Sequence, residues 1–162
     1  MRACRRTARL ANLFIVAAVV AAALAGVATA SASELPADVK TALANSKYVY
    51  ISSTRKDGSL GKPAEIWFLY HNGAVYVGTP PTSWRAKRIK KGRTTAKIAV
   101  GKADGPSFTA TGAIVNEPDV LAVLYETYAK KYPEGWPQFE AKFRNGFKDG
   151  SRVLIKYMPK DS

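Results

Sequence analysis

Residues 75–92 read VYVGTPPTSWRAKRIKKG and place a strand, a turn and a basic helix side by side in the chain. The β-branched and aromatic residues predict a strand that stops at Pro80 and Pro81, because proline cannot continue a hydrogen-bonded ladder. Ser83 then suits the N-cap of a helix, since its hydroxyl can accept a backbone N–H of the first turn. The unpaired N–H groups and positive dipole end of a helix start attract anions. This stretch therefore predicts an anion-binding site.

The helix that follows carries its positive charges in a pattern. Arg85 and Arg88 lie three positions apart and share one face, whereas Ala86 and Ile89 lie on another. Lys87 adds a further charge close to the helix start. A guanidinium group can hold a phosphate through two parallel hydrogen bonds, so this face is a candidate phosphate site. The alternative is a solvated basic face, which we expect for the end of the run.

Residues 1–30 have the pattern of a cleavable export signal. A basic start precedes an uncharged Ala/Val-rich run over residues 11–27, and small residues then allow cleavage after Ala30 or Ala32. An uncleaved membrane anchor is the alternative. The pair Arg5-Arg6 is compatible with a twin-arginine export route. We expect a periplasmic or secreted protein that touches the membrane only through this segment.

Charge and cysteine content exclude several classes of chemistry. The formal charge is +13, and cleavage after residue 30 would remove four arginines and no acidic residue. Cys4 is the only cysteine and leaves with the signal, so the mature chain would have no disulfide, thiol nucleophile or thiolate metal ligand. His71 is the only histidine, which excludes a His-rich metal site. A polyanion or nucleic-acid binder would explain the charge, but export argues against nucleic acid.

Hydrophobic periodicity and turn residues predict one mainly β domain with helices. Residues 31–46 form a lead-in with a helix over 35–45, and residues 47–160 form the domain. We expect strands over residues 48–54, 63–70, 74–79, 94–100, 107–115 and 151–157. Further helices are expected after Ser83 up to Gly92, over 118–131 and over 136–147. Six strands in one small domain favour a barrel or a sandwich over a doubly wound sheet.

The joint order of these motifs resembles the pyridoxamine 5′-phosphate oxidase-like family of flavin-binding proteins. The resemblance covers residues 47–131 and rests on STRKDGSLGKPAEIWFLYHNGAVYVGT, SWRAKRIKKG and TGAIV. It implies an α+β fold, a six-stranded split β-barrel of FMN-binding type with peripheral helices. It also implies a homodimer with FMN bound at the subunit interface.

The resemblance assigns roles to individual positions. Thr79 and Ser83 match the hydroxyl positions of the family's phosphate loop, and Arg85 occupies its phosphate-binding basic position. Lys87 falls on a second basic position. Trp84 stands where the oxidases have an arginine, and the motif that binds the pyridoxal substrate is not recognisable.

Two further residues complete the predicted site. Arg88 shares the face of Arg85, and Trp67 could stack on the flavin ring or serve as core. Flavin would supply hydride or electron chemistry, so we expect an oxidoreductase acting on a small-molecule substrate or electron donor. A deazaflavin is the alternative cofactor, and haem would have to use His71. A non-catalytic cofactor carrier is a further alternative, whereas a hydrolytic triad is not visible.

Overall fold

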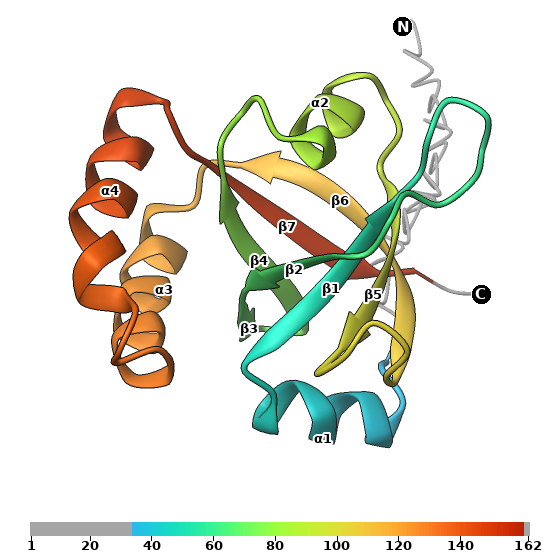
Figure 1. The fold of residues 1–162 in the computed structure, drawn as a ribbon, viewed down its shortest axis with the longest axis horizontal. Helices are drawn as coiled ribbons and strands as arrows, with labels where there is room; N and C mark the ends of the chain where they lie inside the picture. The colour runs from blue at the N-terminus through green and yellow to red at the C-terminus, as the bar shows by residue number, and fades with distance from the viewer. Residues whose placement is uncertain (1–33, 161–162) are drawn as a thin grey trace, which may run out of the picture. The chain divides into compact units, whose positions relative to one another are not determined.

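The structure is a computed structural model that describes residues 34–160. One antiparallel sheet runs in the order β2-β1-β5-β6-β7-β4-β3 (Figure 1). Its strands are β1 (Tyr48–Ser53), β2 (Ala64–Trp67), β3 (Leu69–His71), β4 (Ala74–Thr79), β5 (Thr95–Val100), β6 (Ser107–Val115) and β7 (Val153–Pro159). The helices are α1 (Ala37–Asn45), α2 (Trp84–Lys90), α3 (Pro118–Lys131) and α4 (Trp136–Asp149). The export signal predicted for residues 1–30 lies outside the described residues.

The sheet closes on itself through one bent segment. Residues 63–70 were expected as a single strand, but the ladder is interrupted at Phe68 and the segment forms β2 and β3. Strand β2 pairs with β1 at one end of the sheet order, and β3 pairs with β4 at the other. Because one stretch of chain joins both ends, the sheet is a nearly closed barrel. The predicted barrel is confirmed, but it has seven strands instead of six because the continuous strand expected over residues 63–70 is wrong.

Tyr128 of α3 and Tyr132, the C-cap residue that follows this helix, explain the bend. The hydroxyl of Tyr132 accepts the backbone N–H of Phe68 at 3.1 Å. The hydroxyl of Tyr128 donates to the backbone carbonyl of Trp67 at 3.0 Å. Buried backbone groups need such partners, so these side chains replace the ladder bonds that the bend removes.

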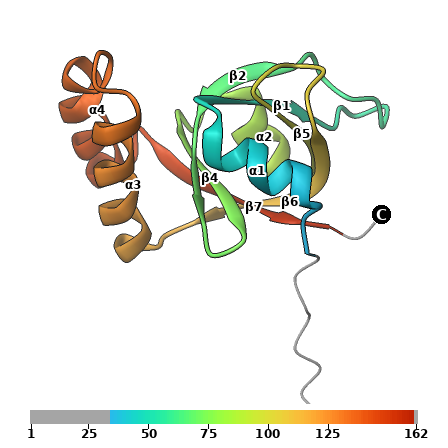
Figure 2. The ribbon, with the colours of Figure 1, turned by 90° about the horizontal axis from the view of Figure 1, so that it is seen from below.

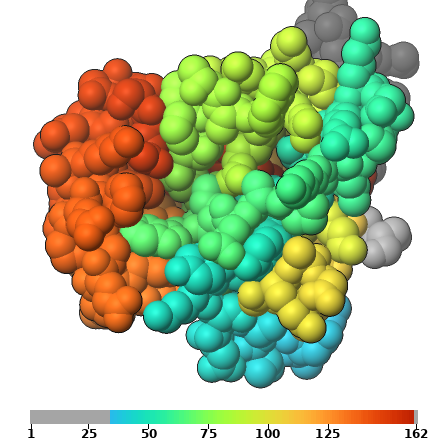
Figure 3. Space-filling view, in the orientation of Figure 1, coloured from blue at the N-terminus to red at the C-terminus, as the bar shows by residue number. Residues whose placement is uncertain are grey.

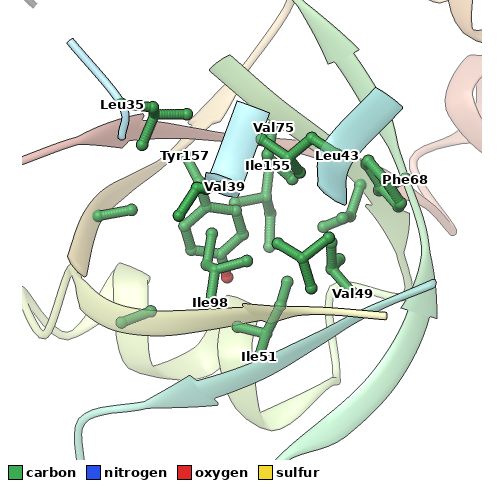
Figure 4. Packing of buried hydrophobic residues seen from close by; sticks show 14 of the residues in the cluster. Leu35, Val39, Leu43, Val49, Ile51, Phe68, Val75, Ile98, Ile155 and Tyr157 are labelled. Atoms are coloured by element: carbon green, nitrogen blue, oxygen red, sulfur yellow. The ribbon is translucent and has the colours of Figure 1, made fainter. Parts of the chain in front are cut away.

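The barrel interior forms the larger core, and helices α1 and α2 lie at its two ends (Figures 1 and 2). Val39 and Leu43 of α1 pack against inward-facing residues such as Val49, Ile98 and Ile155 (Figure 4). At the other end, α2 inserts the buried Ala86, and Ile89 packs beside it. This confirms the expected apolar face of α2, and its two arginines are only partly exposed.

A second core lies between the barrel wall and the helix pair α3 and α4, which stand side by side in Figure 1. Strand β4 is buried along its whole length because both of its faces are covered. Val75 and Val77 belong to the barrel interior, whereas Ala74 and Tyr76 belong to the core under α3 and α4. Alternating side chains of a strand point to opposite faces, so β4 ties the two cores together.

Turn and capping residues in the sequence predicted most helix and strand boundaries correctly. Asn72 and Gly73 both have positive φ, as the expected tight hairpin turn requires. Gly92, with φ of 76°, follows Lys91, the C-cap residue of α2, and the helix ends there as predicted. The last strand starts and ends two residues later than the expected 151–157. Among the described residues, no helix is both long and apolar enough to cross a bilayer.

Candidate functional site

Three of the predicted site residues meet in one cavity of about 470 Å³ beside α2. We call it the basic cavity. Ser83, Arg85 and Arg88 line it together with Arg55 and Lys62. The remaining lining residues are Ile51, Ser53, Ala64 and Trp84, so its wall carries four cations and no carboxylate. The prediction that Arg85 and Arg88 share one side of the helix is confirmed.

Ser83 is the N-cap of α2, as predicted. Its backbone is extended, and its Oγ accepts the backbone N–H of Ala86 at 3.3 Å. Pro80 accepts the backbone N–H of Ser83 at 3.0 Å, which closes the turn between β4 and the helix. The turn therefore holds Ser83 and the first residues of α2 at the cavity wall.

Arg88 anchors α2 to the first strand. Its Nη1 donates to the backbone carbonyl of Ser53 at 2.8 Å and to the Ser53 hydroxyl at 2.9 Å. The backbone N–H of Gly61 donates to the same carbonyl at 2.9 Å. A Cβ at Gly61 would lie only 2.5 Å from Nη1 of Arg88, so a glycine permits this close approach. Arg88 thus has a structural role in addition to lining the basic cavity.

Arg85 has a buried nitrogen without a partner. No group within residues 34–160 forms a hydrogen bond with its buried Nη1, and the same holds for the buried hydroxyl of Tyr157. Burial lowers the pKa of Arg85, and the nearby Tyr157 opposes that shift. Burial also raises the pKa of Tyr157 to about 12. A buried guanidinium N–H without an acceptor is costly, so Arg85 is the clearest candidate for contact with a missing acceptor.

Lys87 lies apart from the basic cavity. Its side chain is exposed, and its Nζ lies 5.4 Å from the ring centre of Trp84. The Trp84 side chain is itself 73% exposed at the edge of the cavity. Sequence reasoning grouped Lys87 with the arginines, but adjacent positions on a helix point in different directions.

Thr79 and Trp67 line a different cavity of about 360 Å³, which we call the aromatic cavity. Its lining residues are Ile66, Trp67, Gly78, Thr79, Pro80, Phe139, Lys142, Phe143 and Arg152. Trp67 also stacks on Tyr132, with ring centres 4.3 Å apart and planes at 4°. The six predicted residues therefore do not converge on one pocket.

Four cationic residues that line these cavities were not predicted, and one of them is Lys142 of α4. Arg55 and Lys62 flank the turn between β1 and β2, and Arg152 directly precedes β7. The sequence KPAEIWFLY at residues 62–70 predicts that Lys62 directly precedes a strand. No local pattern predicts that the loop carrying Lys62 lies beside α2. Among the described residues, no group of three His, Cys, Asp or Glu side chains is placed to hold a metal ion.

Comparison with solved structures shows that the chain shares the split-barrel fold of pyridoxamine 5′-phosphate oxidase-like proteins. A Clostridium acetobutylicum protein of the pyridoxinephosphate oxidase family, related to general stress protein 26, matches with a TM-score of 0.52 and 16% identity. The match covers 75% of this chain and 80% of that one. An F420 reductase matches with a TM-score of 0.51 and 17% identity, over 78% and 97% of the two chains.

The same fold occurs in HutZ, the heme storage protein of Vibrio cholerae. It matches with a TM-score of 0.55 and 11% identity, over 80% of this chain and 93% of that one. No protein-family model matches the sequence, and no curated protein does. The predicted resemblance is therefore confirmed at the level of the fold.

Proposed function

We propose that this chain is an FMN-binding member of the pyridoxamine 5′-phosphate oxidase-like family and acts as an oxidoreductase. The observation that carries the proposal is the basic cavity, whose lining residue Arg85 also has a buried N–H without an acceptor among the described residues. Its four cations and absence of carboxylates favour an anionic ligand. The shared fold with a pyridoxinephosphate oxidase family protein supports the choice of a flavin phosphate.

The residues of the cavity fit the phosphate end of FMN. Arg85 would supply the buried N–H groups, and Ser83 a hydroxyl that can share a further hydrogen bond. The hydrogen bond to Ser53 already fixes the guanidinium of Arg88. Ligand binding would therefore cost Arg88 little side-chain entropy. Bound FMN would supply the hydride or electron chemistry, and the protein would hold and orient it.

A comparison of FMN with riboflavin tests the phosphate contact directly. We expect the protein to bind FMN more tightly than riboflavin, and Arg85→Ala to remove most of that difference. Loss of a charge-assisted hydrogen bond corresponds to about a tenfold weaker affinity or more. Lys90→Ala is the matched control, because Lys90 is exposed on the same helix. Equal FMN affinities in the wild type and Arg85→Ala would remove the basic cavity from the proposal.

A deazaflavin is the second candidate cofactor. It is favoured by the shared fold with an F420 reductase, and its phosphate would use the same arginines. Parallel titrations with FMN and F420 distinguish the two, since each has its own absorption band. Binding of neither would leave a non-catalytic or haem-binding protein of this fold, and a Soret band after haem addition would identify the latter.

We further propose a homodimer with the cofactor at the subunit interface and a small-molecule substrate or electron donor. The exposed Trp84 and the 44% exposed Leu60 are large apolar side chains of the kind that a partner subunit covers. Light scattering of the wild type and Trp84→Ser tests this, with a monomeric variant expected. Export to the periplasm or beyond, inferred from residues 1–30, is tested by cell fractionation and N-terminal sequencing of the mature protein.

A further inference from the structure

We propose that the aromatic cavity is a binding site for a flat aromatic anion, such as an aryl carboxylate. This site is separate from the basic cavity and does not depend on the proposed flavin. It lies where α4 meets the end of β4 and the start of β7. Figure 3 shows the surface of α4 meeting the segment that follows β4.

Aromatic side chains form the walls of this cavity. Phe139 meets the ring of Trp67 edge-on, with ring centres 5.7 Å apart and planes at 90°. Phe143 lies nearly parallel to Trp67 at 6.4 Å. Phe139 is 41% exposed although it is a large apolar side chain. A flat ring entering the cavity would meet both ring faces and ring edges, which are favourable aromatic contacts.

Gly78 forms the floor of the cavity and has no side chain that would fill it. A Cβ at Gly78 would lie 2.8 Å from Phe143 and 2.9 Å from Phe147, so no larger residue fits beneath α4. The buried Thr79 follows Gly78 in β4 and also lines the cavity. The result is a shallow, mainly apolar pocket with a few polar groups, as is common for small-molecule sites.

Two cations at the cavity lack a carboxylate partner. Arg152 donates from Nη1 to the backbone carbonyl of Gly78 at 3.1 Å, and its Cζ lies 3.8 Å from the ring centre of Phe143. Its buried Nε has no hydrogen-bond partner within residues 34–160. Lys142 stands exposed on α4 at the same cavity. No ion pair involves either side chain in the described part of the chain, so both charges are available to an anion.

These observations together select the ligand class. An uncharged aromatic molecule would use the walls but leave the Arg152 Nε without an acceptor. A small inorganic anion would satisfy the charge but leave Phe139 and Trp67 in contact with water. A planar carboxylate satisfies both, because one end accepts hydrogen bonds and the other covers the rings.

The test is a calorimetric titration of the whole protein, without added flavin, with 1-naphthoate. The uncharged 1-naphthalenemethanol and the non-aromatic cyclohexanecarboxylate are the comparison ligands. We expect 1-naphthoate to bind at least about tenfold more tightly than either, since each lacks one of the two contacts. Failure of 1-naphthoate to bind at millimolar concentration, or equal binding of the alcohol, would overturn the proposal.

Variants then locate the site. Lys142→Gln and Phe139→Ala change exposed side chains and should each weaken 1-naphthoate binding several-fold, whereas Arg152→Lys should weaken it about tenfold or more. Lys148→Gln, an exposed lysine of the same helix that does not line this cavity, should bind like the wild type. Arg85→Ala should also bind like the wild type. If Arg85→Ala abolishes binding while Lys142→Gln and Phe139→Ala do not affect it, the anion occupies the basic cavity and the proposal is wrong.

Discussion

The hydroxyl of Tyr132 lies 3.1 Å from the backbone nitrogen of Phe68 and accepts its hydrogen bond. The same hydroxyl donates to the backbone carbonyl of Lys47 at 2.7 Å. One side chain at the C-cap of α3 therefore satisfies the bend between β2 and β3 and also fixes the start of β1. Because the bent segment closes the barrel, α3 helps to define where the sheet closes.

We expect Tyr132→Phe to destabilise the protein by about 1–3 kcal/mol, because it leaves the buried N–H of Phe68 without a partner. The ring remains, so the stack on Trp67 is retained and the loss reports the hydroxyl. Urea unfolding followed by fluorescence measures the change. Tyr50→Phe is the control, since the Tyr50 hydroxyl bonds the Glu65 carboxylate at an exposed site and should matter little. Equal stabilities of the two variants would show that the bend does not need Tyr132.

The approach of α4 to the barrel depends on Gly78. An added Cβ would meet Phe143 at 2.8 Å, so Gly78→Ala should destabilise the protein by about 1–3 kcal/mol through overpacking. Phe143→Leu should remove part of this clash. We therefore expect the double variant to be more stable than the sum of the two single effects predicts, in a double-mutant cycle of urea unfolding. Strict additivity would mean that the helix shifts freely to accommodate the methyl group.

The predictable part of the site is the part built from neighbours in sequence. Ser83, Arg85 and Arg88 lie within one turn and one short helix, so capping rules and helical spacing placed them on one side of α2. The tight turn at Asn72 and Gly73 and the end of α2 at Gly92 follow from backbone preferences in the same way.

The unpredictable part depends on contacts between distant residues. The bend at Phe68 is stabilised by Tyr132, which lies 64 residues later in the chain, and no local sequence pattern predicts this contact. Trp67 was predicted either to stack on a flavin ring or to serve as core, and only the fold shows that α4 packs Phe139 and Phe143 against it. An apolar strand read alone cannot show which of its aromatic residues a later helix will cover.

Arg88 should matter for stability as well as for ligand binding. Arg88→Leu removes two hydrogen bonds to Ser53, and we expect a loss of about 1–3 kcal/mol. Lys87→Leu, at an exposed neighbouring position, should change stability by less than about 0.5 kcal/mol. Thermal unfolding of both variants makes the comparison. A loss no larger for Arg88→Leu than for Lys87→Leu would show that the anchor to β1 is dispensable.

Lys131 gives the molecule a distinctive pH dependence. Its Nζ lies 3.3 Å from the ring centre of the fully buried Phe68, and it forms no ion pair with the described residues. Burial lowers the pKa of Lys131 from an ordinary value of 10.5 to about 8. The folded state therefore binds fewer protons than the unfolded state between these two values, and stability rises with pH across that window. Below pH 8 the charged amine is retained in both states, so its burial penalty is fully present.

Lys131→Met tests this dependence, because methionine keeps a long, flexible side chain that can contact the Phe68 ring. We expect Lys131→Met to be more stable than the wild type at pH 7, and the difference to shrink as the pH rises from about 8 towards 10.5. Comparing the two proteins at each pH cancels the titration of every other group that they share. Lys130→Met, an exposed neighbour on α3, should run parallel to the wild type over the whole range. A pH-independent difference for Lys131→Met would mean that the ring of Phe68 holds the ammonium form in the folded state.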